Sequence, residues 1–476
     1  MEHNTLNSTV DRLWDAEILP SLADLVTIPA LSPAFDPDWS VNGHLDAAAA
    51  HVSRWVQARD LPGATVETVR LEGRTPLVVV DVPATVPDGG SAVGPALGTV
   101  VLYGHLDKQP PVGGWAEGLG PWTPVVRDGR LYGRGAADDG YSGYAATAAI
   151  EAVRAAGGAH ARCVILLETS EESGSPDLAP YLEHLKDMLG DVTLVVCLDS
   201  GGADYSRLWL TTSLRGMVSV DLTVRVLDVA AHSGMASGIV PSSFRVMRAL
   251  LDRLEDSGTG AVLVPEMNVR IPPNRIAEAS ASITPGLGAE LYPLAAGVRP
   301  VTDDELELTL NNSWRPTLSV IGAAGLPKPL DAGNVLRTHT TLTLSFRLPP
   351  TADAEASLES LRKALTTDVP YGAQVELGRA EYADGWNSPE LAPWLRNALD
   401  AVSKDVYDTQ WGTVGLGGSI PFMSLLAETY PAAQFLVTGV CGADSNIHVP
   451  NEWLHLAQAN KVTKSVAHVL NAHATS

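Results

Sequence analysis

The stretch that decides the fold is TVVLYGHLD, residues 99–107. Its first half is a short apolar run bounded by glycine, which predicts a strand buried on both faces. A histidine and an aspartate follow at once, at the carboxyl end of that strand. In open α/β sheets, functional side chains gather at this end of the strands. The stretch therefore predicts a buried sheet and one corner of a functional site.

The same pattern recurs further along the chain. The runs RCVILL at 162–167 and LVVCL at 194–198 are two further predicted strands. The alanine-rich segment 141–156 precedes them and is a predicted helix. Strands that are separated by helices are typical of an α/β layered sheet.

The central part of the chain has a different periodicity. Its predicted strands alternate apolar and polar residues, at 218–226, 317–321 and 340–348. Two predicted helices accompany them, at 242–256 and 354–366. Strands with one solvent-exposed face, and with helices covering the other face, indicate a two-layer α+β unit.

These patterns divide the chain of 476 residues, whose length itself favours more than one globular unit. We predict a catalytic α/β domain in two parts, residues 1–212 and 380–476. A smaller inserted α+β domain, residues 213–379, interrupts it.

Composition excludes several classes of partner. The chain has 55 acidic and 32 basic residues and a formal charge of −23, which argues against nucleic acid and anionic membranes as partners. It has no apolar run of membrane-spanning length, and residues 1–22 lack the features of a signal peptide. We therefore expect a cytoplasmic protein. Cys163, Cys197 and Cys441 are far apart in sequence, and we expect reduced thiols.

Side chains that could bind metal follow the predicted strands or open the predicted helix. They lie in five short segments: GHLD at 104–107, ADDG at 137–140, EESGS at 171–175, DSGG at 199–202 and DSNIH at 444–448. Each segment alone is more often a turn or a solvated surface, but together they indicate a metal centre. His105 and Asp107 are two residues apart and point to the same side of an extended chain. A carboxylate in that position fixes the tautomer of a ligating imidazole.

The motifs also carry a resemblance to a known family. They are YGHLDKQP, LYGRGAADDG, EESGS, LDSGG, HSGMASG, GGSIPF and DSNIHVPNE, and they span residues 103–452. In content and order they resemble the metallopeptidase family of carnosinases, cytosolic dipeptidases, aminoacylases and glutamate carboxypeptidases, with the carnosinase-like dipeptidases most similar. The resemblance implies a mixed-sheet catalytic domain of the zinc-peptidase type, interrupted by an α+β dimerisation or lid domain.

The resemblance further implies a site with two divalent metal ions. The implied ligands are His105 and Asp199 for one ion, Glu172 and His448 for the other, and Asp138 as a bridge. Asp107 would orient the ring of His105, and Glu171 would be the general base. These ligands suit Zn²⁺, although Mn²⁺ or Co²⁺ could occupy the same positions. The implied reaction is hydrolysis of an amide bond in a small peptide-like substrate by metal-bound hydroxide.

The inserted domain contributes candidate substrate-binding residues. His232 resembles a family histidine that enters the partner subunit's active site and stabilises the oxyanion, which implies a homodimer. Arg347 resembles an arginine that pairs with a substrate carboxylate, although a solvent-facing structural arginine is an equal alternative. Asn334 is a further candidate. Gly418 and Ser419 lie in a glycine-rich turn whose backbone could approach a substrate.

Some positions depart from the carnosinase-like pattern. Gly140 replaces the usual lysine after the paired aspartates, Gly415 and Leu416 replace Arg-Glu, and residues 334–337 replace Thr-Val-Ile-Pro. A dipeptidase is therefore the leading hypothesis. A deacylase or amidohydrolase of an N-acylated or modified amino acid is the alternative within enzymes.

A third hypothesis is a non-catalytic binding protein on the same fold. The presence of Asp107, Glu171 and every implied ligand argues against it.

Overall fold

The computed structural model describes residues 1–85, 97–283, 289–418, 420–442 and 444–476. These residues form two compact units. Unit 1 comprises Met1–Thr212, Ser388–Val414 and Leu425–Ser476, and unit 2 comprises Ser213–Asn387 and Gly415–Ser424.

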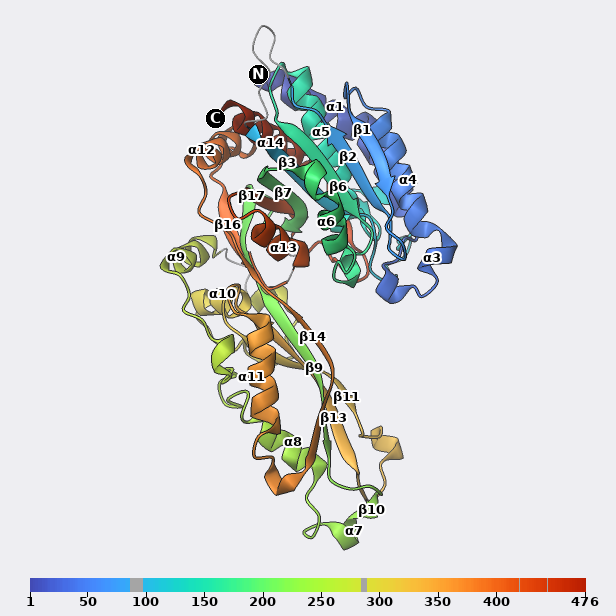
Figure 1. Ribbon diagram of the computed structural model, residues 1–476, viewed down its shortest axis with the longest axis vertical. Coiled ribbons are helices and arrows are strands. Elements are labelled where there is room, and N and C mark those ends of the chain that lie inside the picture. The colour runs from blue at the N-terminus through green and yellow to red at the C-terminus, as the bar shows by residue number, and fades with distance from the viewer. Residues whose placement is uncertain (86–96, 284–288, 419, 443) are drawn as a thin grey trace. The chain divides into compact units, whose positions relative to one another are not determined.

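Unit 1 is built on a six-stranded mixed sheet in the order β1-β2-β6-β3-β7-β17 (Figure 1). Its strands are β1 (Thr65–Val69), β2 (Leu77–Val82), β3 (Thr99–His105), β6 (Arg162–Glu168), β7 (Val192–Gly201) and β17 (Gln434–Cys441). β3 is parallel to both of its neighbours, β6 and β7, and β17 is parallel to β7. β1 and β2 are antiparallel additions at one edge. Every residue of β3 is buried, as its apolar sequence predicts.

Unit 1 also contains helices, some packed on this sheet and others on neighbouring helices. They are α1 (His3–Leu13), α2 (Leu19–Val26), α3 (Trp39–Asn42), α4 (His44–Gln57), α5 (Ser142–Ala155), α6 (Leu178–Leu189), α12 (Pro393–Val402) and α14 (Leu456–Thr475). The small side chains of α5 let it pack closely between β3, α1 and α14, and most of this helix is buried. A second sheet of unit 1 has the order β18-β5-β4, with bounds Trp453–His455, Arg130–Tyr132 and Val125–Arg127.

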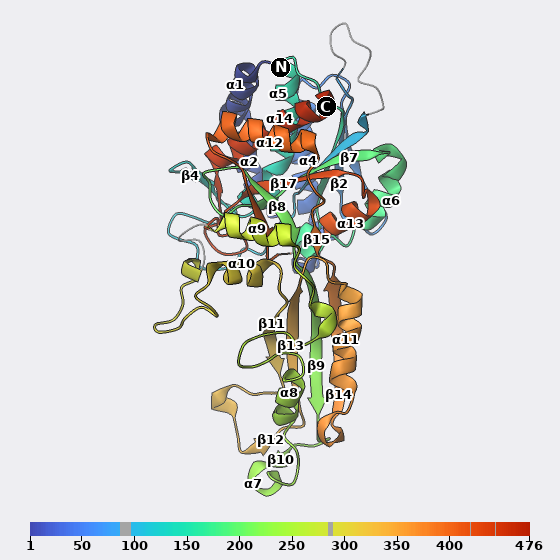
Figure 2. The same ribbon diagram turned by 90° about the vertical axis from the view of Figure 1, so that its left-hand side faces the viewer.

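Unit 2 is a two-layer α+β structure. Its antiparallel sheet has the order β11-β13-β9-β14, with bounds Thr317–Ala324, His339–Leu348, Gly216–Arg225 and Gln374–Ala383. β13 alternates between half-buried and buried residues, so that its apolar side chains face one side of the sheet. On that side α8 (Ser243–Leu251) and α11 (Ala354–Thr366) close the core (Figure 2).

The remaining elements lie within unit 2 or run across a boundary between the units. They are β8 (Trp209–Leu214), β10 (Ala231–His232), α7 (Ser233–Ala236), α9 (Pro273–Ser282), α10 (Glu305–Ser313), β12 (Val335–Leu336), β15 (Trp386–Asn387), β16 (Gly412–Leu416) and α13 (Pro421–Thr429).

The predicted fold class is confirmed: a mixed α/β sheet in one unit and a two-layer α+β arrangement in the other. β14 pairs with β9 along Gln374–Ala383, so the sequence-based boundary at 379/380 falls inside a strand. Cys163, Cys197 and Cys441 are free thiols. Within the described residues, no helix is long and apolar enough to cross a membrane.

Candidate metal centre

The parallel strands of unit 1 bring the candidate ligands together. His105 is the last residue of β3, and Asp199 lies near the carboxyl end of β7. Glu171 and Glu172 form a 3-10 turn three residues after β6. Because β3, β6 and β7 are parallel neighbours, their carboxyl ends meet at one edge of the sheet. Asp138 joins them from the turn that precedes α5.

The carboxylate of Asp138 lies between two imidazoles. Its Oδ1 is 3.2 Å from Nε2 of His105, and its Oδ2 is 2.9 Å from Nε2 of His448. A second carboxylate accompanies each ring: Asp199 Oδ1 is 3.8 Å from His105 Nε2, and Glu172 Oε2 is 3.4 Å from His448 Nε2. The geometry thus groups the side chains into two sets of donors that share one carboxylate.

Glu171 lies on the His105 side of this cluster. Its Oε2 is 4.0 Å from His105 Nε2, and donor atoms of His105, Glu171 and Asp199 lie within 4.8 Å of one another. Donor atoms of His105, Asp138 and Glu172 satisfy the same limit. The distances alone therefore admit either glutamate as a ligand, and the division into ligand and base stays a prediction.

The electrostatics of the cluster fit divalent cations. Burial, followed by the charge of Asp199, raises the pKa of Glu171 well above its ordinary value. Burial, followed by the charge of Asp138, raises the pKa of Glu172 to about 8. These two shifts indicate that ionisation of Glu171 and Glu172 is unfavourable without a compensating charge, whereas the two imidazoles lower the pKa of Asp138. Carboxylate oxygens and imidazole nitrogens are suitable donors for zinc, manganese and cobalt, so the residues fit the implied ions.

Asp107 contacts both the backbone of the Glu171–Glu172 turn and the ring of His105. Its Oδ1 and Oδ2 accept hydrogen bonds from the backbone N–H groups of Glu171 and Glu172, at 3.1 and 3.0 Å. The backbone oxygen of Asp107 is 3.1 Å from His105 Nδ1, and its Oδ1 is 3.5 Å from the same atom. The sequence predicted the contact with the ring. It did not predict the contact with the glutamate turn, which lies 64 and 65 residues further along the chain.

Glu452 is a positioning residue that the sequence analysis missed. It is fully buried and accepts hydrogen bonds from Arg134 Nη1 at 2.7 Å and from the backbone N–H of Gly135 at 2.9 Å and Ala137 at 3.2 Å. These bonds fix the turn that carries Asp138. The sequence offered one signal: Arg134 and Glu452 are oppositely charged and lie in two of the quoted motifs, LYGRGAADDG and DSNIHVPNE.

The predicted substrate-binding residues lie in unit 2. His232 is exposed in β10, where it pairs with Val335 of β12, and the neighbouring Ser233 N–H donates to the Asn334 carbonyl at 2.9 Å. His232 and Asn334 are therefore neighbours across this short ribbon. Gly418 is exposed, and Ser419 lies outside the described residues.

Arg347 has a second arginine beside it. It is half-buried in β13, and burial lowers the pKa of its guanidinium. Burial, followed by the charge of Arg347, lowers the pKa of Arg215 to about 10. Arg215 donates to the carbonyls of Asn311 and Gly417, both at 3.2 Å. Arg215 was missed because nothing in its local sequence distinguishes it from a strand-end arginine.

Comparison with known proteins identifies the family. The sequence profile of peptidase family M20/M25/M40 matches residues 101–472. The chain belongs to this peptidase family. It is accordingly a metallohydrolase that acts on peptide bonds, and the resemblance to carnosinase-like dipeptidases is confirmed.

Individual members of the family align over most of their length. A cysteinylglycine-S-conjugate dipeptidase of Corynebacterium striatum is 26% identical over 367 residues, which cover 74% of this chain and 76% of the relative. The Beta-Ala-His dipeptidase of Homo sapiens is 27% identical over 375 residues, covering 75% and 71%. The solved structure of the dipeptidase Dug1p from Saccharomyces cerevisiae covers 100% of both chains, with a TM-score of 0.76 at 22% identity. This last likeness shows that the fold is shared.

The double role of Asp107 predicts a loss of metal affinity in Asp107→Asn. The amide group cannot accept hydrogen bonds at both positions, so one glutamate N–H loses its acceptor. We expect affinity for Zn²⁺ to fall about 10- to 100-fold, the usual effect of losing a partner behind a metal ligand. Titration against a competing chelator measures this. The control is Asp81→Asn, which removes a carboxylate that pairs with Arg162 on β6; equal affinities in both variants would contradict the assignment.

Proposed function

We propose that this peptidase hydrolyses the peptide bond of dipeptides or similarly small peptide-like substrates with two divalent metal ions. The observation that carries the proposal is the Asp138 carboxylate between two imidazoles, each with a second carboxylate. The relatives support a small substrate, since their names specify a cysteinylglycine S-conjugate and β-Ala-His.

The proposed ligands divide into two sets. They are His105 and Asp199 for one ion, His448 and Glu172 for the other, and Asp138 for both. Zinc is the proposed ion, with manganese or cobalt as substitutes. When bound, such ions polarise the scissile carbonyl and lower the pKa of a coordinated water.

Glu171 is the proposed general base. Its side chain is largely buried beside His105, and its backbone is fixed by Asp107, so the carboxylate is held at the edge of the ligand cluster. In this position it accepts a proton from the attacking water and delivers it to the leaving amine. Burial raises the pKa of Glu171, which makes the carboxylate a stronger base than one exposed to water.

Unit 2 supplies the proposed substrate contacts. A guanidinium binds a carboxylate through two parallel hydrogen bonds, and Arg347 with Arg215 concentrates positive charge suited to the free carboxylate of a dipeptide. His232 is the proposed oxyanion donor, with Asn334 and the turn at Gly418 as further contacts.

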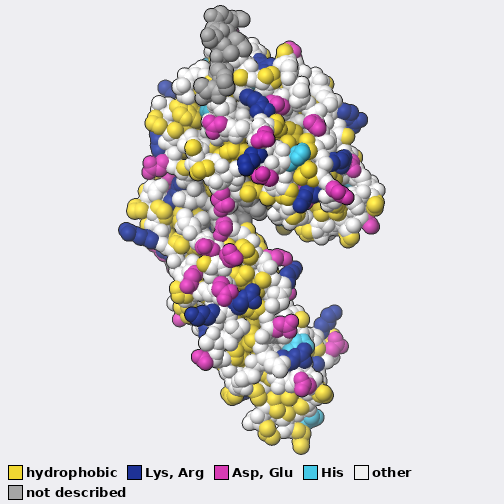
Figure 3. Space-filling model, viewed as in Figure 1, with side chains coloured by type: hydrophobic (Ala, Val, Ile, Leu, Met, Phe, Trp, Pro, Cys, Tyr) yellow, Lys and Arg dark blue, Asp and Glu magenta, His cyan; other side chains and the backbone are white. Residues whose placement is uncertain are grey.

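We also propose that two copies pair through unit 2. β11 is an edge strand of the four-stranded sheet, and its Val320 and Ile321 are 50% and 64% exposed. An open edge with apolar side chains favours pairing with another chain. Exposed apolar residues also gather over the end of unit 2 that carries α7 and β10, among them Val229, Met235 and Ile239 (Figure 3). Covering this surface would bring the exposed His232 into an interface.

Glutamine substitutions separate the proposed base from the proposed ligand. Glu171→Gln should lower kcat by about 10²-fold or more, because the amide cannot accept a proton, and metal content should stay near normal. Glu172→Gln should instead lower metal content. Elemental analysis and steady-state kinetics on a dipeptide measure both effects. Chelation should abolish activity, and Zn²⁺, Mn²⁺ or Co²⁺ should restore it.

Two results would contradict this account. Activity in protein shown to be metal-free would exclude the proposed reaction. Metal loss in Glu171→Gln with retention in Glu172→Gln would reverse the two roles.

Recognition of the substrate carboxylate is tested with Arg347→Ala. Dipeptides with a free C-terminal carboxylate should lose roughly 1.5–3 kcal/mol of binding, as expected for a charged hydrogen bond. Dipeptides amidated at that end should bind poorly to the original protein and change little in the variant. Arg379→Ala, which removes an exposed arginine from β14 of the same sheet, is the control. Equal losses for both substrate types would show that Arg347 is structural.

Mixed dimers test whether His232 acts across the interface. His232→Ala and Glu171→Gln should each be nearly inactive alone. In a mixed dimer, one site combines an intact Glu171 with the intact His232 of the other copy, so activity should recover to about half by two-fold symmetry. Co-expression with two affinity tags isolates the mixed species. Failure to recover activity in dimers of proven composition would mean that His232 acts within its own chain or has no catalytic part.

A further inference from the structure

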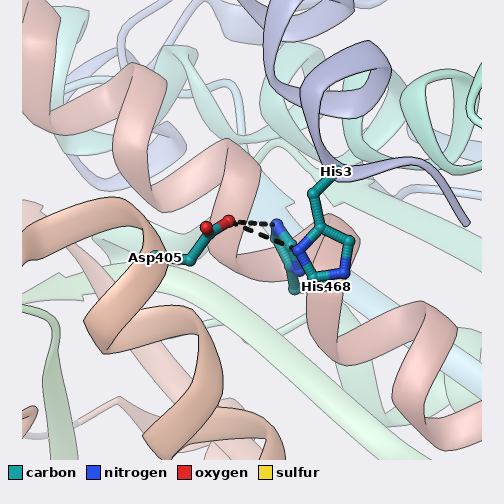
Figure 4. A group of neighbouring side chains, drawn as sticks. All are labelled: His3, Asp405 and His468. Atoms are coloured by element: carbon teal, nitrogen blue, oxygen red, sulfur yellow. Dashed lines mark ion pairs between the residues drawn. The ribbon is translucent and has the colours of Figure 1, made fainter.

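Three side chains outside the peptidase site converge in unit 1. They are His3 of α1, His468 of α14 and Asp405 of the short π-helix Ser403–Tyr407 (Figure 4). One donor atom of each lies within 4.8 Å of the others. The cluster therefore brings two imidazoles and a carboxylate together from opposite ends of the chain.

The distances in this cluster differ from those of hydrogen bonds. Asp405 Oδ2 is 3.6 Å from His3 Nδ1 and 3.5 Å from His468 Nε2. Hydrogen bonds between nitrogen and oxygen span about 2.7–3.2 Å. In a tetrahedral zinc site with bonds of about 2.0–2.1 Å, neighbouring donor atoms are roughly 3.3–3.4 Å apart. The separations match two ligands of a common ion more closely than two hydrogen-bonded groups.

His468 adds an independent observation. It is only 8% exposed, and its Nε2 has no hydrogen-bond partner in the described part of the chain. Buried polar atoms in proteins nearly always have a partner. Here the unpartnered nitrogen faces the carboxylate and the second imidazole, which is where a cation would satisfy it.

We propose that His3, Asp405 and His468 bind one divalent transition-metal ion, at a site separate from the peptidase centre. Imidazole and carboxylate donors suit Zn²⁺, whose tetrahedral geometry matches these separations. The His3 and Asp405 side chains are 54% and 39% exposed, so water can supply the remaining ligands. By binding both His3 and His468, the ion would crosslink the first turn of α1 to α14.

Zinc stoichiometry tests the site directly. The probe is Zn²⁺ alone: proteins are dialysed to equilibrium against a fixed free concentration, and bound zinc is measured by elemental analysis. His3→Gln and Asp405→Asn remove one ligand each at positions that are partly exposed, so the buried His468 is left in place. Each variant should bind one ion fewer per chain than the original protein. Peptidase activity should not change, because neither residue belongs to the peptidase centre.

A matched control and a second readout complete the test. His184→Gln removes an exposed histidine from the middle of α6 and should keep the full zinc stoichiometry. Zinc should also slow hydrogen exchange at the start of α1 in the original protein and in His184→Gln, but not in His3→Gln. Unchanged stoichiometry in both His3→Gln and Asp405→Asn would overturn the proposal. Equal loss in His184→Gln would overturn it too, since the zinc would then be bound by surface histidines in general.

Discussion

The sharing of one carboxylate by two imidazoles is the constraint on which the rest of the site depends. Asp138 can reach both His105 and His448 only if a turn before α5 meets the end of β3 and a loop near the C-terminus. That requirement concentrates buried carboxylates, whose mutual repulsion and lost hydration are unfavourable. Divalent cations offset this cost. Metal binding and correct folding of this edge of the sheet are therefore expected to be coupled.

Buried residues outside the proposed ligand set hold the geometry in place. Asp107 ties the glutamate turn to the end of β3, and Glu452 ties the Asp138 turn to the segment near His448. In both residues the carboxylate oxygens accept hydrogen bonds from backbone N–H groups. They therefore fix the position of the main chain and not only that of a flexible side chain. The arginine at 134 pairs with Glu452 and compensates its charge in the interior. The precision of the cluster thus comes from main-chain anchoring.

The sequence predicted features that local patterns encode. The buried strand β3 followed from TVVLY, and the gathering of His105 with Asp199 followed from the rule that parallel strands end at one edge. Contacts between distant segments were not predictable in this way. The hydrogen bonds of Glu452 reach across more than 300 residues, and the pairing of β14 with β9 depends on partners that periodicity does not specify. Most residues of β14 are exposed or half-buried, which weakens the apolar signal of a strand.

The two clusters of imidazole and carboxylate groups have the same donor chemistry, but their surroundings suit different roles. In the proposed peptidase centre, Glu171 lies beside the proposed ligands and is anchored through Asp107, so the proposed proton acceptor is held in position. In the described residues around His3 and His468, the group has one carboxylate, Asp405, and that carboxylate is itself a proposed ligand. Among the described residues, this group holds no second carboxylate that could act as a base in the way proposed for Glu171. This difference in the residues around the donors supports the proposed division, with hydrolysis at the first cluster and a structural role for the second.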